Sequence, residues 1–314
     1  MRDSGFPKRP VLGLGALLLA LSLAACGQNG NNQSKNKDTL GADAVNEIVL
    51  AALPKWDKSI LDVKDRTNWA SDLTFAGIAD AMQDSAPTYP TNDETLPPAD
   101  AHLVQDASRS IQMHPTMGSF RYANRDRGWN YKTASPKLPI DKATALGLVK
   151  TAAKTLNIPA GELAGKDIVR TQIAAGTSNM DPVDGPVKFE DRFEMYRVVT
   201  LKRQINQLPV MGSRIRGAVG LVGEATLIQR MYAHWPAFKL TPNLAVPSQK
   251  EVARIATQEI LDRDPSSDLQ VKAQLAYVPK DLGDEKITFS PAVVLWVDSG
   301  ETPFMVTVDF PAKG

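Results

Sequence analysis

Cysteine is almost absent from this chain, with Cys26 as the single cysteine among 314 residues. A lone thiol excludes an intramolecular disulfide, so this chain is not one of the small secreted proteins whose fold is held together by disulfides. The folded body must instead be stabilised by burial of apolar side chains. Its hydrophobic content of 43% is near the value typical of globular proteins, which favours a packed fold over a disordered one.

An excess of charge of either sign is also lacking. The chain has 36 Lys and Arg residues against 35 Asp and Glu residues, a formal charge of +1. Residues 1–25 contain three of the basic residues and one acidic residue, so their removal leaves 33 against 34, close to −1. A balance of this kind gives no reason to expect nucleic acid or an anionic lipid surface as the partner.

Long apolar runs are missing except near the N-terminus. The run from Val11 to Leu23 follows Arg2, Lys8 and Arg9, and it is shorter than the roughly 20 residues that span a bilayer. It ends in Leu23-Ala24-Ala25-Cys26, where small residues directly precede a cysteine. This arrangement is typical of bacterial lipoproteins, so we predict a signal peptide over 1–25 and lipid attachment at Cys26.

The segment after the cleavage point contains Gln, Asn, Gly, Ser and Lys with almost no apolar residue. Such a segment cannot offset its ordering entropy by burial, so we predict a flexible tether over 26–40 that leads from a lipid-anchored N-terminus in the cell envelope. Gly27 is not the aspartate that often retains lipoproteins at an inner membrane. The outer membrane is therefore favoured where an envelope has two.

Catalytic motifs are lacking as well. The histidines His102, His114 and His234 are not spaced as zinc ligands, and no Gly-x-Ser-x-Gly or phosphate-binding loop is present. Cys26 cannot act as a nucleophile once it is acylated. We therefore expect a protein with no catalytic residues, no metal site and no cofactor, which is not an enzyme.

Two alternatives remain open at this stage. One is an enzyme acting on cell-envelope material, with a site between residues 101–135 and the sheet where His102, His114, Arg121 and Arg125 would converge. The other is a purely structural surface protein.

For residues 41–138 the sequence pattern predicts a region of mixed helix and coil. Apolar residues at helical spacing between 43 and 53 favour a helix that stops at Pro54, and Leu73 to Met82 favour a second short helix. Four prolines between Asp84 and Asp100 indicate an irregular linker. Residues 101–135 show no clean period and receive no assignment.

From Pro139 onward the same order of elements occurs twice, with the capping residues Asp141 and Ser248 about 107 positions apart. A helix with one apolar stripe follows each cap. The stripes contain Ala145, Leu148, Val149, Ala152 and Leu156 in the first copy, and Val252, Ile255, Ala256 and Ile260 in the second. Strands with alternating apolar residues follow each helix. They are predicted over 167–174, 189–205, 213–221, 225–234, 269–278, 287–298 and 303–310.

This pattern predicts an α+β fold with tandem modules, each having one helix packed on an antiparallel sheet. The first module covers 139–240 and the second covers 241–314.

The phrase Gln207-Leu208-Pro209-Val210-Met211-Gly212 resembles the Gly-Leu-Pro-Val-x-Gly hairpin of the propeptide domain that precedes thermolysin-type proteases, with Gln207 where that family has glycine. The helix with Glu-Val-Ala-Arg-Ile-Ala at 251–256 is similar to the PepSY domain. The resemblance covers about 139–312. It implies a free-standing envelope lipoprotein with tandem propeptide-like (FTP-like) and PepSY-like domains, which binds or regulates an exported protein as an inhibitor or chaperone. The chain has no His-Glu-x-x-His and no protease follows the last strand, so such an action would be exerted in trans.

The partner-binding residues expected on this basis are Leu208, Pro209, Val210, Gly212 and Trp235. Apolar residues at a hairpin tip either pack under a neighbouring element or protrude into a partner, and packing is the more common outcome. Trp235 and Phe238 either fill the junction between the modules or present an exposed anchor.

Five cations near the hairpin could bind an acidic partner or a carboxylate-bearing wall polymer, although such charges are more often only the solvated face of a sheet. They are Arg197, Lys202, Arg203, Arg214 and Arg216. Docking would use the hairpin tip, a sheet face or strand addition.

Overall fold

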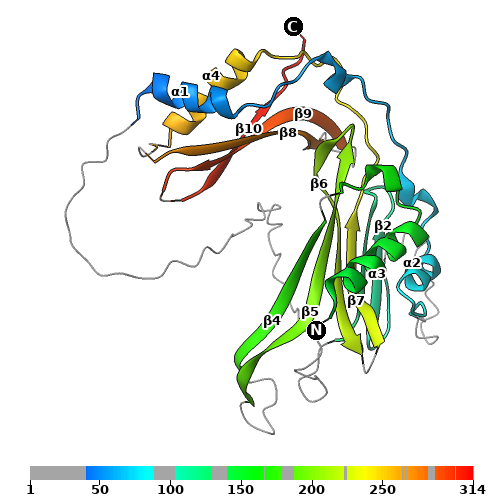
Figure 1. The fold of residues 1–314 in the computed structure, drawn as a ribbon. Coiled ribbons are helices and arrows are strands. Elements are labelled where there is room, and N and C mark those ends of the chain that lie inside the picture. Colours follow the sequence, from blue (N-terminus) through cyan, green and yellow to red (C-terminus); the bar gives the residue numbers. More distant parts are fainter. Residues whose placement is uncertain are drawn as a thin grey trace, which may run out of the picture. The chain divides into compact units, whose positions relative to one another are not determined.

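The computed structural model describes residues 40–87, 103–128, 140–165, 167–178, 187–222, 225–263, 265, 268–281, 287–300 and 302–313 (Figure 1). The predicted leader, Cys26, nearly all of the tether, His102 and most of the predicted linker lie outside these residues. In the described part the fold is α+β, with four α-helices and ten strands in one sheet, as the sequence predicts for the class.

Seven strands form the larger part of the sheet, in the order β1-β2-β3-β7-β6-β5-β4 with every neighbour antiparallel. Their bounds are β1 Leu103–Gln105, β2 Arg109–His114, β3 Ser119–Asn124, β4 Ile168–Ser178, β5 Val187–Ile205, β6 Leu208–Val222 and β7 Ala225–His234. Strands β5, β6 and β7 form the meander that the sequence predicts. The unassigned segment 101–135 supplies β1 to β3, which widen the sheet beyond the predicted module.

Helix α3 (Lys142–Thr155) covers one face of this sheet, together with the shorter helix α2 (Phe75–Ala81) (Figure 1). The Asp141 carboxylate accepts a hydrogen bond of 2.7 Å from the Thr144 amide and so caps the helix as predicted. The apolar stripe of α3 is buried against β5, β6 and β7. This first core leaves the opposite face of the sheet without a contact to α2 or α3.

Three further strands, β8 (Gln270–Asp281), β9 (Ile287–Asp298) and β10 (Phe304–Asp309), form an antiparallel meander. One residue pair, Val210 and Tyr277, joins β8 to β6 in parallel. Helix α4 (Gln249–Leu261) packs on this meander, and its cap Ser248 accepts a hydrogen bond of 3.2 Å from the Glu251 amide. Helix α4 and this meander pack in a second core, which also contains residues from β5 and β6.

The N-terminal region does not form a layer of its own. Helix α1 (Ala42–Ala52) packs beside α4, where Val45 and Val49 are fully buried in the second core. The following 3₁₀ turns are η1 (Lys58–Leu61) and η2 (Trp69–Asp72), and a third, η3 (Ala160–Glu162), follows α3. Ile60 belongs to the second core, whereas Trp69 packs against the first. The segment predicted as 41–138 is thus divided between both cores.

The chain joins the two cores through a short run after β7. Arg66 and Phe238 exchange backbone hydrogen bonds of 2.8 and 3.1 Å, and the Phe238 ring stacks on Phe289 at 5.0 Å between centroids. Phe238 also meets the edge of Tyr277 at 5.1 Å. Phe238 is therefore fully buried in the second core, beside the chain that leads out of β7. Among the described helices, none has the length and apolar character needed to cross a bilayer.

Candidate binding face

The predicted hairpin tip is packed rather than protruding. Asn206 and Gln207 form the two-residue turn between β5 and β6, both with positive φ. The Val210 side chain is only 3% exposed and lies in the second core, while Leu208 and Pro209 are half-buried. Only the backbone of Gly212 is exposed at this end of β6. The hairpin tip therefore joins the first module to the second core.

Trp235 is also an interior residue, with 1% of its surface exposed. Its indole Nε1 donates a hydrogen bond of 3.0 Å to the Glu162 carboxylate. The ring faces the Arg203 guanidinium at 5.2 Å. Trp235 thus fills the junction, the first of its two predicted roles, and its ring does not reach the described surface.

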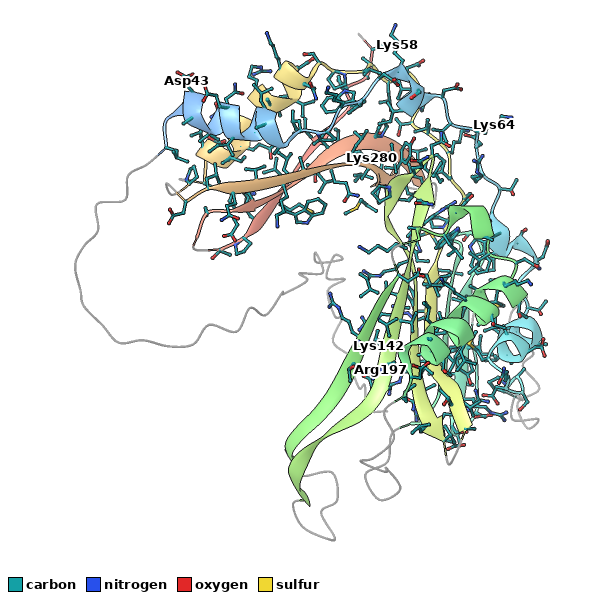
Figure 2. All side chains as sticks on the ribbon, in the orientation of Figure 1. Asp43, Lys58, Lys64, Lys142, Arg197 and Lys280 are labelled. Carbon is teal, nitrogen blue, oxygen red and sulfur yellow. The ribbon has the colours of Figure 1, made fainter. Side chains whose placement is uncertain are left out.

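The five cations predicted near the hairpin divide into two groups, and the prediction that they cluster on one surface is wrong for two of them. Arg203 is 1% exposed, donates to Glu162 at 2.7 Å and to the Pro236 carbonyl at 2.6 Å. Arg197 is 7% exposed and donates from Nε to the Ile140 carbonyl at 2.8 Å, beside the start of α3 where Figure 2 also labels Lys142. Both occupy inward positions of β5, whose buried neighbours are Val199 and Leu201.

Lys202, Arg214 and Arg216 lie instead on the opposite face of the large sheet, which no described helix covers, because they alternate with buried residues of β5 and β6. Three cations from other strands share this face. Arg121 comes from β3, Arg170 from β4 and Arg230 from β7, and all three are exposed. We call these six side chains the cationic face.

Strand register arranges the cationic face in three successive rows. The first row pairs Lys202 with Arg214 and continues to His234, and the second runs from Thr200 through Arg216 and Tyr232 to Arg121. The third runs from Arg170 through Val198, Ala218 and Arg230 to Ala123. Each row holds two cations, and adjacent rows are about 6.8 Å apart because two residues of a strand separate them.

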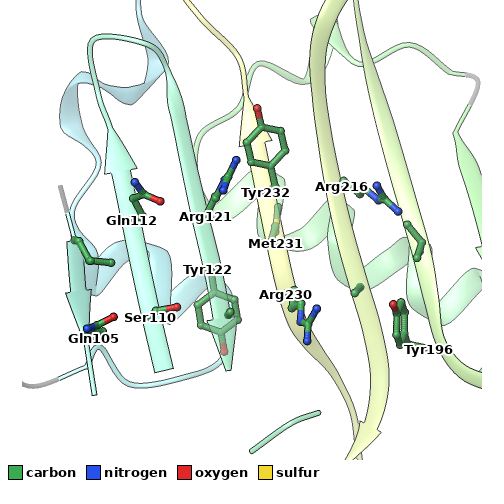
Figure 3. Close-up of a pocket in the computed structure, with 14 residues that line it drawn as sticks. Gln105, Ser110, Gln112, Arg121, Tyr122, Tyr196, Arg216, Arg230, Met231 and Tyr232 are labelled. Atoms are coloured by element: carbon green, nitrogen blue, oxygen red, sulfur yellow. The ribbon is translucent and has the colours of Figure 1, made fainter. Parts of the chain in front are cut away.

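The middle of this face is hollowed. The hollow has a volume of about 430 Å³, and its lining comes from β1, β2, β3, β5, β6 and β7 (Figure 3). Tyr232 lies toward one end of the hollow beside Arg121, whose guanidinium carbon is 5.6 Å from the ring centroid (Figure 3). The other polar residues of the lining include Arg216, Arg230, Tyr196, Gln105, Ser110 and Gln112. Small residues such as Ala218 and Ala123 leave the floor between these side chains open.

No member of the cationic face forms an ion pair with a carboxylate of the described residues. Burial is the main cause of the pKa shifts of the neighbouring groups, and the cations act on them in addition. Burial lowers the pKa of His234, and Arg203 and Arg214 lower it further, so the imidazole is neutral near pH 7. Burial raises the pKa of Tyr232, while Arg214 and Arg121 act against that shift. Among the described residues, the six cations of this face therefore have no carboxylate paired with them.

Of the residues of the alternative enzyme site, the three that the structure describes, His114, Arg121 and Arg125, do not converge. His114 pairs with Ser119 at one end of the β2–β3 hairpin, Arg121 lies further along β3, and Arg125 follows the other end of that strand. The described lining of the hollow contains no His, Cys, Asp or Glu. No group of three or more such residues within the described ranges is arranged to hold a metal ion. The lining supplies guanidinium and hydroxyl donors, which bind anions, rather than a base that accepts a proton.

Arg230 and Tyr232 are not among the predicted site residues, and Arg121 is predicted in a different site. Alternation along 225–234 puts Arg230, Tyr232 and His234 on one face, so their common side could have been predicted. These three residues lie beside Arg214 and Arg216 because β7 pairs with β6, and the sequence pattern alone does not fix that pairing.

No family model matches the sequence, and no curated protein matches it. Among solved structures, the chain is similar to an uncharacterized protein from Eubacterium rectale ATCC 33656, with 13% sequence identity and a TM-score of 0.37 over 78% of this chain and 81% of that chain. What the protein does is therefore inferred from its own residues.

Proposed function

We propose that this protein is a lipid-anchored, non-catalytic lipoprotein of the cell envelope that binds an exported protein on the cationic face. The observation that carries the proposal is a sheet with one face packed under helices and the other bearing six cations without an acidic partner among the described residues. An acidic surface of a partner would supply the missing counter-charges, since charge complementarity steers association and fixes register.

The anchoring part of the proposal is supported by the sequence before residue 40. The apolar run ending in Leu23-Ala24-Ala25-Cys26 fits cleavage before Cys26 and acylation of its thiol. The tether that follows, at about 5–6 Å times the square root of its length, would hold the body roughly 20 Å from the membrane surface. Partners that pass close to that surface would be within reach.

The regulatory part of the proposal is supported by the resemblance to propeptide and PepSY domains. In that arrangement the tandem modules would act in trans, as an inhibitor or chaperone of an exported protein. The second module, with α4 on β8–β10, would hold the β5–β6 hairpin by covering Val210.

Photo-cross-linking in cells tests whether the cationic face contacts a polypeptide. A cross-linking amino acid at Gln112, which lines the hollow, is expected to give one prominent adduct with an exported protein. The same probe at Glu259, exposed on α4, is the matched control and is expected to give none. Adding Arg216→Glu should remove the Gln112 adduct.

Adducts from Glu259 but not from Gln112 would contradict the proposed face while keeping a binding role. For the anchor, mass spectrometry of the native protein is expected to find an N-terminal diacylglyceryl-modified Cys26, and Cys26→Ser should release the protein from the membrane fraction. An unmodified Cys26 in the native protein would refute the lipoprotein assignment.

A further inference from the structure

The cations over β6 and β7 have a spacing that matches an extended chain. Arg214 and Arg216 are two residues apart on β6, and Arg230 on β7 lies one row further along. The three side chains therefore step along the strand direction at intervals of about 6.8 Å. Alternate side chains of an extended polypeptide repeat at the same interval and point to the same side.

The six cations are costly to the free protein. Lys202 is directly opposite Arg214 on the neighbouring strand, and like charges in that position destabilise a sheet. Arg216 and Arg121 flank the same tyrosine from both sides. A face with this arrangement gains most from a ligand that brings several carboxylates at once, because each arginine can form two parallel hydrogen bonds with one carboxylate.

Strand addition is not open to such a ligand at this place. Both sides of β6 and β7 are hydrogen-bonded to neighbours along the rows, so the backbone groups are already paired. Recognition has to come from side chains that project from the face. Tyr232 (Figure 3) and the half-buried Ala218 offer contact area for the intervening residues of a bound chain.

From this geometry we infer that the occupant of the cationic face is an extended acidic segment of a polypeptide, with carboxylates at alternate residues, lying along β6 and β7. The inference rests on the proposed function and deepens it, since it names the chemistry and period of the bound segment. The carboxylates would contact Arg214, Arg216 and Arg230 in turn, with Lys202, Arg121 and Arg170 to either side.

Two synthetic peptides of equal length and charge test the period. One repeats Glu-Ser, and the other repeats Glu-Glu-Ser-Ser, which places only half of its carboxylates at the alternate positions of one side. Calorimetry with the protein body from residue 38 onward is expected to show about tenfold tighter binding of the Glu-Ser repeat, with affinity falling as salt rises. Equal affinity for the two peptides would overturn the inferred spacing of carboxylates at alternate residues, while the inference of an acidic ligand would stand.

Charge reversal tests the location. Arg216→Glu should weaken binding of the Glu-Ser repeat by about tenfold or more, whereas Arg254→Glu, an equal charge change on the exposed side of α4, should leave it within about twofold. Circular dichroism confirms that both variants are folded. Equal losses from both variants would overturn the site and indicate attraction by net charge alone.

A third probe distinguishes the occupant from other polyanions. Inorganic polyphosphate binding tightly while neither peptide binds would overturn the polypeptide occupant. If neither the peptides nor polyphosphate binds but the Gln112 adduct forms in cells, the inference of an extended acidic segment is wrong and the proposed function stands. If the adduct is also missing, the proposed function fails with it.

Discussion

Position along a strand decides whether a cation in this protein is structural or available for a ligand. Arg203 lies on the inward side of β5, and the Glu162 carboxylate meets it at 2.7 Å. Burial lowers the pKa of Arg203, and the charge of Glu162 opposes that shift, so the pair keeps the guanidinium charged inside the core. Lys202, one residue earlier, is exposed on the cationic face. Neighbouring cations of one strand thus serve opposite purposes.

The β5–β6 turn gives a direct test of backbone strain. Gln207 has a φ of 65°, in the left-handed region that costs an L-residue other than glycine or asparagine about 1 kcal/mol. Gln207→Gly is expected to raise the free energy of unfolding by about 0.5 kcal/mol, because the greater freedom of glycine in the unfolded chain offsets part of the relief. Urea denaturation measures the change. Gln207→Ala keeps the strain and should show no gain, and a loss on Gln207→Gly would show that the glutamine side chain stabilises the turn.

Asp84 gives a pH-dependent test. Burial raises its pKa, but hydrogen bonds from the Tyr122 hydroxyl at 2.6 Å and from Asn124 at 2.7 Å outweigh that effect, with Arg127 adding to them, and the net pKa is lowered. The stabilisation is therefore present above the unfolded value near 3.9 and is lost as the pH falls through the folded value.

Asp84→Asn is thus expected to cost about 2 kcal/mol of unfolding free energy at pH 7 and far less in strong acid. Denaturation of the wild type and the variant across pH 2–7 measures this difference. Asp80→Asn, on the exposed side of α2, is the control and should change little at any pH. A cost of Asp84→Asn that is the same at all pH values would show that shape rather than charge is responsible.

At the scale of elements, the contact of α3 with the sheet depends on a glycine. A Cβ on Gly217 would come 2.5 Å from Cγ2 of Val149, a stiff β-branched side chain that cannot move aside easily. Gly217→Ala should therefore destabilise the protein by about 1–3 kcal/mol through overpacking. Gly147→Ala, on the exposed side of the same helix with nothing within 4 Å, should stabilise it by about 1 kcal/mol. Thermal unfolding compares the two, and equal effects would mean that α3 shifts to accommodate the methyl group.

The elements that sequence periodicity predicts well are those whose pattern is set by one apolar face. Helices α3 and α4 begin where Asp141 and Ser248 predict, and β7 and β9 span the predicted residues. Strands β1 to β3 escaped prediction because they are short and β3 combines buried polar residues with apolar ones. Ser119 and Asn124 are both buried there.

The candidate site could be predicted only in part for a related reason. Alternation assigns Arg214 and Arg216 to one side of β6 from sequence alone, and the same rule places Arg203 on the inward side of β5 with Leu201. The rows that bring Arg121 and Arg230 beside them join strands that are far apart in the chain, and β3 reaches β7 across about a hundred residues. Register of that kind is fixed by tertiary packing rather than by local pattern.

At the scale of the whole molecule, the second core is assembled from both ends of the described chain. Val45 and Val49 of α1 pack with α4 and β8, while the first core is formed by residues that lie between them in the sequence. Backbone bonds between Arg66 and Phe238 and the contact of Tyr277 with the Ile60 carbonyl at 3.0 Å hold the two chain ends together. Loss of either end therefore removes part of the second core.

Val49→Ala tests this coupling. The side chain is fully buried between α1 and α4, so its truncation is expected to lower the free energy of unfolding by about 2 kcal/mol. Because the chain from Asp38 to Gly314 is one compact unit, hydrogen exchange should become faster in peptides from α3 of the first core as well as from α4 of the second. Ala76, exposed on α2, offers the control in Ala76→Ser, with unchanged exchange in both helices. Faster exchange confined to α4 would show that the two cores unfold independently, and the cationic face would then keep its geometry even when the second core opens.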